Sequence, residues 1–426
     1  MKIRIIGGGL AGSEAAWYLA NKGEHVILQE MRPSDKALAH HSDKFGELVC
    51  SNSLKSKDIC NAAGLLKEEM KCYGSLIMEA ALFSEVGAGQ ALAVDREMFQ
   101  DYITNKLTSH PNIEIERSEA TSINEDEITI VCSGPLTSST FSNYLKDYLG
   151  NDYYYFYDAA APLLLKDGID FNIAYYKSRY DKGDADYINL PFTKDEFFDF
   201  YHALVDAKRV ELHSFEKEVH FESCMPIEVM AKRGFKTLTF GPLKPVGLER
   251  PDGTRPFAVV QLRQDNVNGD MYNIVGFQTN LTFKEQERVF KMIPGLKNAQ
   301  FVRYGVMHRN TYINSPKLLS VNLNLYEHPN VFFAGQLTGV EGYIESAATG
   351  IIAAINAYRY KHNLVLNKVP METVLGALIN YVSSVNSKNF QPMNANYGVL
   401  NSPLKDKNEI ANLSLLKTKE WIKENA

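Results

Sequence analysis

The first thirty residues carry the feature that most limits the fold. An apolar segment at 2–6 leads into the glycine turn Gly7-Gly8-Gly9-Leu10-Ala11-Gly12, a helix-like segment at 13–20 and an apolar strand at 25–30. This is the Gly-x-Gly-x-x-Gly arrangement of a strand–turn–helix unit that binds a dinucleotide. Its first glycine allows the tight turn, its second lets the backbone approach a pyrophosphate, and its third permits close packing of helix and strand. The alternative is a purely structural turn, which the position between strand and helix disfavours.

Two residues at the end of the second strand are expected to extend this dinucleotide-binding site. Glu30 ends that strand, at the distance from the glycines where a carboxylate accepts hydrogen bonds from a ribose. Arg32 is expected to stack on, or hydrogen-bond near, the adenine or the ribose. The residues that we expect to bind the cofactor in this part of the chain are Gly7, Gly8, Gly9, Leu10, Ala11, Gly12, Glu30 and Arg32.

Late segments favour FAD over NAD as the cofactor. Residues 331–336 read as a buried strand that ends at Gly335 and Gln336, and a small-residue helix start follows at Ser346. Gln336 stands where an acid is usual, and its amide can still hydrogen-bond a ribityl hydroxyl. These elements require the C-terminal third to fold back onto the N-terminal sheet, which a site for NAD alone does not need. The predicted class is α/β, a Rossmann-type two-dinucleotide-binding flavoprotein fold.

The middle of the chain differs in pattern and predicts an inserted α+β domain at 190–299. Proline and glycine punctuate β-type segments there, such as 236–240 and 257–262. The FAD-binding domain would then be discontinuous, at 1–189 and 300–426. Further expected elements are a strand at 128–131, an aromatic strand at 153–157, an amphipathic helix at 283–296 and a helical tail at 404–426.

Composition excludes several functional classes. Five cysteines without a Cys-x-x-Cys pair argue against a disulfide framework and structural zinc, and we expect no bound metal. The N-terminus lacks the pattern of a secretory signal, and no apolar stretch is long enough for a bilayer, so we expect a cytoplasmic protein without membrane contact. The net charge of −6 predicts no general affinity for nucleic acid.

One local charge pattern runs against that average. Basic residues outnumber acidic ones between Cys224 and Arg263, and they include Lys232 and Arg233. The segment is either a solvated face or a binding surface for an anionic partner. Lys232 and Arg233 would also favour the thiolate form of Cys224.

Cys50 is the other candidate reactive thiol. It lies among polar, hydroxyl-bearing and basic residues, and Lys44, Lys55 or turn N–H groups could stabilise its thiolate. An inert, half-buried thiol is the alternative for Cys50 and for Cys224. His308, a single histidine after an apolar stretch, is by pattern alone more typical of a structural residue than of a ligand contact.

A set of longer motifs covers essentially the whole chain. They are HHSDKFGELVCSNSLKSKDICNAAGLLKEEM at 40–70, ALAVDR at 91–96, FYDAAAP at 156–162, KSRYDKG at 177–183, CMPIEVMAKRG at 224–234, GPLKPVG at 241–247, YGVMHRNTYINSP at 304–316, GQLTGVEGYIES at 335–346 and NFQPMNANYG at 389–398. Together they closely resemble the folate- and FAD-dependent tRNA (uracil-5-)-methyltransferases, which are similar to the glucose-inhibited division protein A flavoproteins. The chain departs from the usual residues of that family at a few positions, which include Gly8, Gly87, Gln90 and Leu190.

The resemblance implies a reaction. Methylenetetrahydrofolate would deliver a one-carbon unit to N5 of the reduced flavin, which passes it to C5 of a uracil, with NADPH or NADH as the external reductant. Uracil C5 is a poor nucleophile until a thiolate adds at C6, and by matching position Cys224 is that nucleophile. Cys50 would lie near the flavin, where it shields or stores the methylene adduct or removes the C5 proton.

The resemblance also implies binding roles and partners. Tyr343 would stack on the flavin ring, His308 would sandwich the pterin, and Arg309 is a further folate or substrate candidate. Lys232 and Arg233 would hold RNA phosphates. The expected RNA is tRNA, with large-subunit ribosomal RNA as the alternative and a flavin oxidoreductase acting on a small molecule as the less favoured one. No obligate protein partner is expected.

Overall fold

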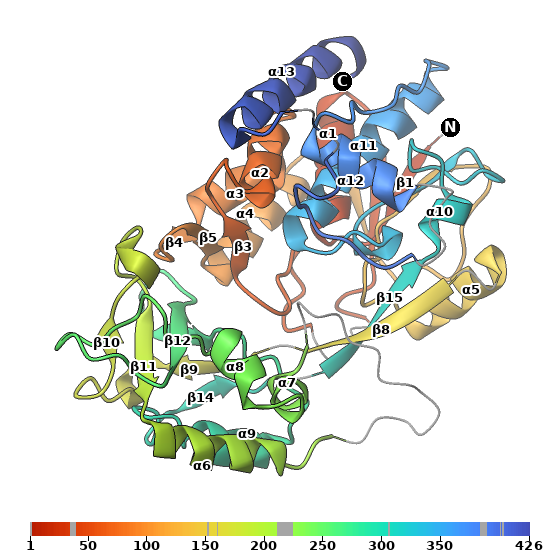
Figure 1. Cartoon of the computed structure of the whole chain (residues 1–426). Helices are drawn as coiled ribbons and strands as arrows, with labels where there is room; N and C mark the ends of the chain where they lie inside the picture. The colour runs from red at the N-terminus through yellow and green to blue at the C-terminus, as the bar shows by residue number, and fades with distance from the viewer. Residues whose placement is uncertain are drawn as a thin grey trace.

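A five-stranded parallel sheet forms the centre of the first part of the molecule (Figure 1). The computed structural model describes residues 2–34, 40–150, 153–159, 161–210, 225–305, 307–383, 390–400, 402 and 404–426. The strand order is β16-β7-β1-β2-β6, and each pairing is parallel. The bounds are β1 Ile3–Ile6, β2 Val26–Glu30, β6 Ile113–Arg117, β7 Ile128–Val131 and β16 Val331–Phe333. The chain leaves β1 on one side and returns on its other side at β7, which places a ligand crevice at the carboxyl ends of the strands.

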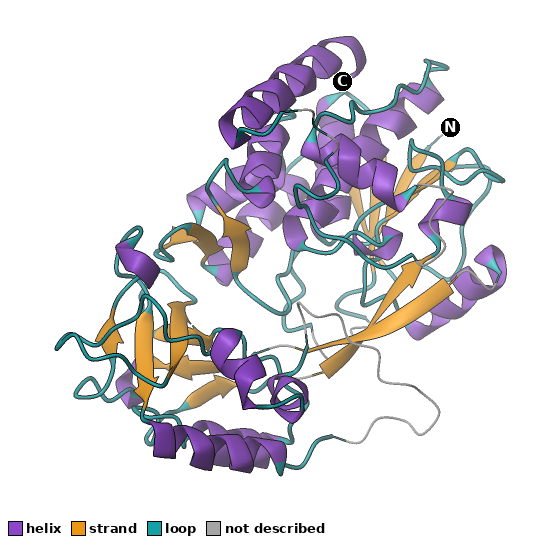
Figure 2. Ribbon diagram, viewed as in Figure 1, coloured by secondary structure: helices purple, strands orange, loops and turns teal. Residues whose placement is uncertain are grey.

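Helices cover both faces of this sheet (Figure 2). Helix α11 lies directly against α1, because Gly350 leaves no side chain between them: a Cβ there would lie 2.2 Å from the Ala11 carbonyl oxygen. Phe141 of α5 packs in the core on the other face. We call the sheet and these helices the parallel region. Its helices are α1 Leu10–Asn21, α2 Ala62–Cys72, α3 Leu76–Phe83, α4 Arg96–Thr108, α5 Ser139–Leu149, α10 Ser315–Leu318, α11 Tyr343–Lys361, α12 Val374–Val382, α13 Lys407–Asn425 and the short 3-10 turn η4 Gln336–Thr338.

A second sheet of six strands forms the antiparallel region. Its order is β10-β11-β12-β13-β9-β14, and its pairings are antiparallel. Helices α6 and α9 lie side by side below the strands (Figure 2) and bury Phe200 and Phe290 in a core separate from the first. The bounds are β9 Leu163–Leu165, β10 Tyr175–Tyr176, β11 Ile188–Phe192, β12 Ala258–Gln264, β13 Met271–Ile274, β14 Phe301–Arg303, α6 Lys194–Val205, α7 Ile227–Lys232, α8 Phe235–Phe240, α9 Phe283–Phe290 and the 3-10 turns η1 Lys166–Gly168 and η2 Arg179–Asp181.

Two smaller strand groups complete the fold. The antiparallel pair β8 (Tyr153–Ala159) and β15 (Met307–Ile313) runs between the two regions (Figure 1). A three-stranded sheet consists of β3 Ser53–Ser56, β5 Ala91–Val94 and β4 Glu85–Val86. Within the described ranges, no helix carries an apolar run that could cross a membrane. The same ranges contain no cluster of three or more His, Cys, Asp or Glu suited to a metal ion.

The expected elements agree with the structure except in the antiparallel region. Its sheet takes β9 and β10 from before residue 190 and β14 from after residue 299, so it extends beyond both expected boundaries of the insertion. The strand expected at 236–240 is wrong, because these residues form α8 between Gly234 and Gly241. Alternation would place Leu238 and Phe240 on one face, but the helix buries Leu238 and leaves Phe240 78% exposed. The helix expected at 283–296 ends at Phe290.

Candidate active site

A pocket opens at the carboxyl ends of the parallel strands. Each of the five strands contributes to its lining. The contributing segments are 7–11 after β1, 29–32 at the end of β2, 118–120 after β6, 132–138 after β7 and 335–336 after β16. This is the position where open α/β sheets bind their ligands.

Most of the residues that were predicted from the sequence to bind the cofactor line this pocket. They are Gly7, Gly9, Leu10, Ala11, Glu30, Arg32, Gly335, Gln336, Tyr343 and Ser346, and Cys50 lies among them. Gly8 and Gly12 lie behind this lining. A Cβ at Gly12 would lie 1.8 Å from the Gly7 carbonyl oxygen, and one at Gly8 would lie 2.3 Å from the Phe45 ring. These two glycines therefore permit the close packing that shapes the turn.

The helix N-termini at the pocket fit a dinucleotide. Helices α1 and α11 begin at Leu10 and Tyr343, which both line the pocket, and neither N-cap residue supplies a side-chain hydrogen bond. The N–H groups of these first turns are suited to a diphosphate or another anion. A Cβ at Gly9 would meet no atom within 4 Å, so open space lies in front of the turn. FAD is therefore compatible with the residues that form this pocket.

Glu30 and Arg32 form a buried ion pair at the pocket wall. Arg32 Nε lies 2.9 Å from Glu30 Oε1, and Arg32 Nη1 lies 2.9 Å from Glu47 Oε2. The Gly8 N–H donates to Glu30 Oε2 at 2.8 Å. Burial alone would raise the pKa of Glu30, but the bonds from Arg32 and Gly8 outweigh it and hold the pKa below its usual value. Both Glu30 oxygens are thus engaged within the protein, and the expected ribose contact stays a prediction.

Cys50 contacts Tyr343 at the pocket. The Cys50 sulfur lies 3.0 Å from the Tyr343 hydroxyl oxygen, and the Cys50 and Ser51 N–H groups donate to that oxygen at 2.9 and 3.2 Å. The two lysines that were expected to stabilise the thiolate pair with carboxylates instead. Lys44 Nζ lies 2.6 Å from Asp101 Oδ1, and Lys55 Nζ lies 2.6 Å from Glu345 Oε1.

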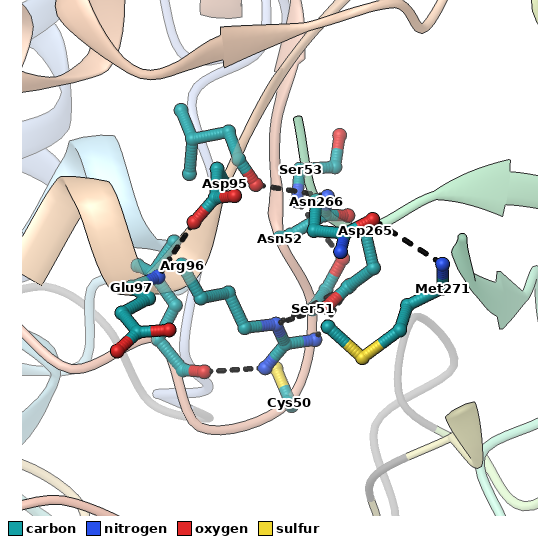
Figure 3. Close-up of polar contacts among 12 residues, drawn as sticks. Cys50, Ser51, Asn52, Ser53, Asp95, Arg96, Glu97, Asp265, Asn266 and Met271 are labelled. Atoms are coloured by element: carbon teal, nitrogen blue, oxygen red, sulfur yellow. Dashed lines mark hydrogen bonds and ion pairs between the residues drawn. The ribbon is translucent and has the colours of Figure 1, made fainter. Parts of the chain in front are cut away.

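Arginines from three other elements interact with residues 48–52, which we call the Cys50 loop. Figure 3 shows Arg96 of α4 with its guanidinium beside Cys50 and Asp265. Arg96 Nε lies 3.1 Å from Asp265 Oδ2, and Arg96 Nη1 donates to the Leu48 carbonyl at 2.6 Å. Arg263 of β12 donates to Asn52 Oδ1 at 3.0 Å and to Ser51 Oγ at 2.7 Å. These contacts join the Cys50 loop to the antiparallel region.

Arg303 of β14 is the third arginine near this loop. Its Nε and Nη2 atoms are buried and make no hydrogen bond. Burial and, to a smaller extent, the Arg96 charge lower the pKa of Arg303 to about 10, whereas Asp265, Tyr343 and Cys50 oppose this shift. The guanidinium is therefore still protonated at neutral pH.

The remaining candidates are only partly placed. Cys224 lies outside the described residues, so its role stays a prediction. His308 and Arg309 belong to β15, where His308 pairs with Asp158 and Arg309 with Tyr157 along the backbone. Lys232 ends α7 and Arg233 follows it; both side chains are exposed and neither lines the pocket.

Several lining residues were missed from the sequence. Ser118 and Glu119 follow β6, Ser133 follows β7, His40 comes from a connecting segment and Asn310 from β15. The position after a parallel strand was the available signal for the first three, because all these strand ends meet at one edge of the sheet. Cys132 is buried in the pocket wall, and burial raises the pKa of its thiol well above the usual value.

The sequence matches a known family over most of its length. The pattern of the family described as glucose inhibited division protein A matches residues 2–364. The chain belongs to this family. The family resemblance of the sequence motifs is thereby confirmed.

Individual family members are more similar still. The chain is 56% identical over 411 residues to methylenetetrahydrofolate–tRNA-(uracil-5-)-methyltransferase TrmFO of Anoxybacillus flavithermus, covering 96% of this chain and 95% of that one. It is also 56% identical over 409 residues to the protein of the same name from Bacillus subtilis, covering 96% and 94%.

A solved structure of the family has the same fold. The chain superposes on Aquifex aeolicus GidA in its form I crystal with a TM-score of 0.74 at 17% identity, covering 99% of this chain and 75% of that one. The form II crystal gives 0.73 and 16%. The predicted Rossmann-type α/β fold is confirmed.

Proposed function

We propose that this protein transfers the one-carbon unit of methylenetetrahydrofolate to C5 of a uridine in tRNA, with FAD as its cofactor, and so forms 5-methyluridine. The observation that carries the proposal is the position of Cys50 and Tyr343 in a pocket formed by a dinucleotide-binding turn and two helix N-termini. The near full-length identity to relatives named as TrmFO methyltransferases supports the same chemistry.

Residues on opposite ends of the chain would hold FAD. The turn at Gly7–Gly9 and the first turn of α1 would bind the diphosphate, and Arg32 would lie beside the adenosine part. Gln336 and the first turn of α11 would hold the ribityl chain and the ring, with Tyr343 against the ring. When bound, FAD would supply the electrons and carry the one-carbon unit.

The two cysteines would have different tasks. Cys224 would add to uracil C6, which makes C5 nucleophilic. Cys50, which contacts Tyr343 at the pocket, would shield or store the methylene adduct or accept the proton that leaves C5. His308 and Arg309 are the proposed folate contacts.

The RNA would approach from the side of α7. Lys232 and Arg233 are exposed there and suited to phosphates. We further propose that the substrate is tRNA and not ribosomal RNA, and that NADPH or NADH is the reductant.

The decisive experiment is a reconstituted methylation assay. The FAD-loaded protein is incubated with methylenetetrahydrofolate, NADPH or NADH, and one of two transcripts, a tRNA or a large-subunit ribosomal RNA. Mass spectrometry of the nucleosides measures 5-methyluridine. We expect it in the tRNA, and expect Cys224→Ala to abolish it while FAD stays bound.

Cys60→Ala is the matched control, because Cys60 is half-buried and its sulfur contacts Asn408, away from the pocket. This variant is expected to keep full activity. Product in the ribosomal transcript alone would replace tRNA by rRNA as the substrate. Reduced flavin with no product in either RNA would contradict the proposal.

A further inference from the structure

The Tyr343 hydroxyl donates its hydrogen to the Cys50 sulfur. A tyrosine hydroxyl has one hydrogen to donate and two lone pairs that accept. The N–H groups of Cys50 and Ser51 both donate to the Tyr343 oxygen, at 2.9 and 3.2 Å, and so use both lone pairs. The hydroxyl hydrogen then points to Cys50 Sγ, 3.0 Å away.

The Tyr343 hydroxyl keeps its proton at neutral pH. Burial raises the pKa of Tyr343 well above its usual value, the Cys50 charge raises it further, and only Arg96 and the Ser51 N–H oppose them. A donor that does not ionise favours a negatively charged acceptor, because a hydrogen bond to an anion is stronger than one to a neutral group.

Among the described residues near the Cys50 loop, arginines outnumber acids. Arg96 and Arg263 hydrogen-bond to the loop from α4 and β12, Arg303 of β14 interacts electrostatically with Cys50, and Asp265 is the acid that pairs with Arg96. Arg263 donates to the neutral oxygens of Asn52 and Ser51. Arg303 has two buried nitrogen atoms without any acceptor.

The acids on the pocket side do not cancel this excess. Glu30 and Glu47 are paired with Arg32, and Glu345 is paired with Lys55. His40, Glu119 and Cys132 are the other titratable groups that line the pocket. A buried, unmatched guanidinium is costly unless an anion lies near it, and the Cys50 sulfur is placed to be that anion.

We propose that Cys50 is a thiolate at neutral pH, held in that state by the Tyr343 hydroxyl and by the unmatched charge of Arg303 and Arg263. Tyr343 and Arg303 are then positioning residues for the sulfur. The inference deepens the proposed function and rests on it for its catalytic meaning, since a thiolate at the pocket is what could accept the C5 proton. Its test does not depend on methyl transfer.

The test is an ultraviolet pH titration of the FAD-loaded protein. Thiolates absorb where thiols do not, and the difference between the protein and its Cys50→Ser variant isolates this one sulfur. We expect half-ionisation at least about one pH unit below the ordinary cysteine value of about 8.5. Each further variant is compared with the same variant carrying Cys50→Ser.

Two substitutions test the two supports separately. Tyr343→Phe keeps the ring and removes the donor, and we expect the midpoint to rise by about one pH unit. Arg303→Gln is expected to raise it by a similar amount, and Arg303→Lys to restore it. Tyr397→Phe is the control, because its hydroxyl donates to the Ile59 carbonyl at 3.1 Å and does not line the pocket.

The proposal is overturned if Cys50 ionises at or above the ordinary value in the unsubstituted protein, or if neither variant raises the midpoint. Should Arg303→Gln not fold, Tyr343→Phe decides alone. A low midpoint in a protein without methyl-transfer activity would contradict the proposed function and leave the charge state of Cys50 established.

Discussion

The parallel and antiparallel regions each bury a hydrophobic core but use their sheets differently. In the parallel region every strand ends at the same edge, and the segments that follow form one pocket. In the antiparallel region neighbouring strands run in opposite directions, so strand ends are divided between two edges and the core under α6 and α9 is closed. None of its described strands contributes to the pocket lining.

The antiparallel region contributes charge instead of a cavity. Arg263 and Asp265 lie at the end of β12, where Arg263 contacts the Cys50 loop and Asp265 pairs with Arg96. Arg303, at the end of β14, interacts electrostatically with Cys50. Under the proposed function, the parallel region binds the cofactor, and the antiparallel region sets the electrostatics of Cys50 and positions it.

The largest expected effect concerns the ion pair that joins the regions. Asp265→Ala leaves Arg96 largely buried without its acid, since the two side chains are 3% and 11% exposed. We expect the free energy of unfolding to fall by about 3 kcal/mol. Both tryptophans, Trp17 and Trp421, lie in the parallel region, so urea unfolding followed by their fluorescence and by circular dichroism measures one region against the whole.

The matched control is Glu68→Ala, which removes an exposed pair with Lys71 within α2. It is expected to cost less than about 0.5 kcal/mol. If Asp265→Ala costs no more than this control, the two regions are not coupled through Arg96.

The next effect concerns pH and belongs to the parallel region. Glu69 is buried in α2 and accepts hydrogen bonds from the Val374 and Leu375 N–H groups, at 2.8 and 2.9 Å, and from the Ser414 hydroxyl. Burial raises the pKa of Glu69 from 4.5 to about 7, although these bonds lower it. Between these two values the folded protein retains a proton that the unfolded chain has released.

The contribution of Glu69 to stability is therefore full at low pH and is lost as the pH rises to about 7. Glu69→Gln cannot titrate, so we expect the stability difference between the two proteins to change by up to about 3 kcal/mol between pH 5 and pH 8. Tryptophan fluorescence during urea unfolding measures it. Glu68→Gln is the control, because it replaces a neighbouring carboxylate that lies at the surface. We expect no such change for this variant. An equal change in both variants would exclude Glu69 as the cause.

The sequence predicted the parallel region better for a physical reason. Its pocket depends on local signals, the glycine turn and the strand ends, which are readable at 7–12 and 331–336. The contacts of Cys50 depend on long-range packing instead. Lys44 and Lys55 are near Cys50 in sequence but bind carboxylates. Arg96 and Arg263 are far from it in sequence and hydrogen-bond to its loop.

The antiparallel region was predicted less well because its local signals conflict with its packing. Residues 236–240 have strand-like threonines, yet the glycines on both sides and the burial of Leu238 alone favour the helix α8. The basic residues between Cys224 and Arg263 were predicted to form a single surface. It is divided in the structure, since Arg263 is buried at the Cys50 loop and Lys232 is exposed at the end of α7.

The smallest expected effect tests that exposed part. Replacing Lys232 and Arg233 by alanine removes two exposed charges at the end of α7 without touching the pocket. If the antiparallel region presents the RNA-binding face, tRNA affinity should fall about fivefold, or about 1 kcal/mol, because each exposed phosphate contact contributes little. The slope of log Kd against log salt should decrease by about 1 for each phosphate that is no longer neutralised, which filter binding over a salt series measures.

Lys417→Ala and Lys71→Ala are the charge-matched controls, since both lysines are exposed on helices of the parallel region. A uniform electrostatic attraction would weaken binding equally in all these variants, whereas a local contact lowers the salt slope only for the α7 pair. An unchanged slope in that pair would move the RNA to another face. The antiparallel region would then act on the reaction only through the arginines that surround Cys50.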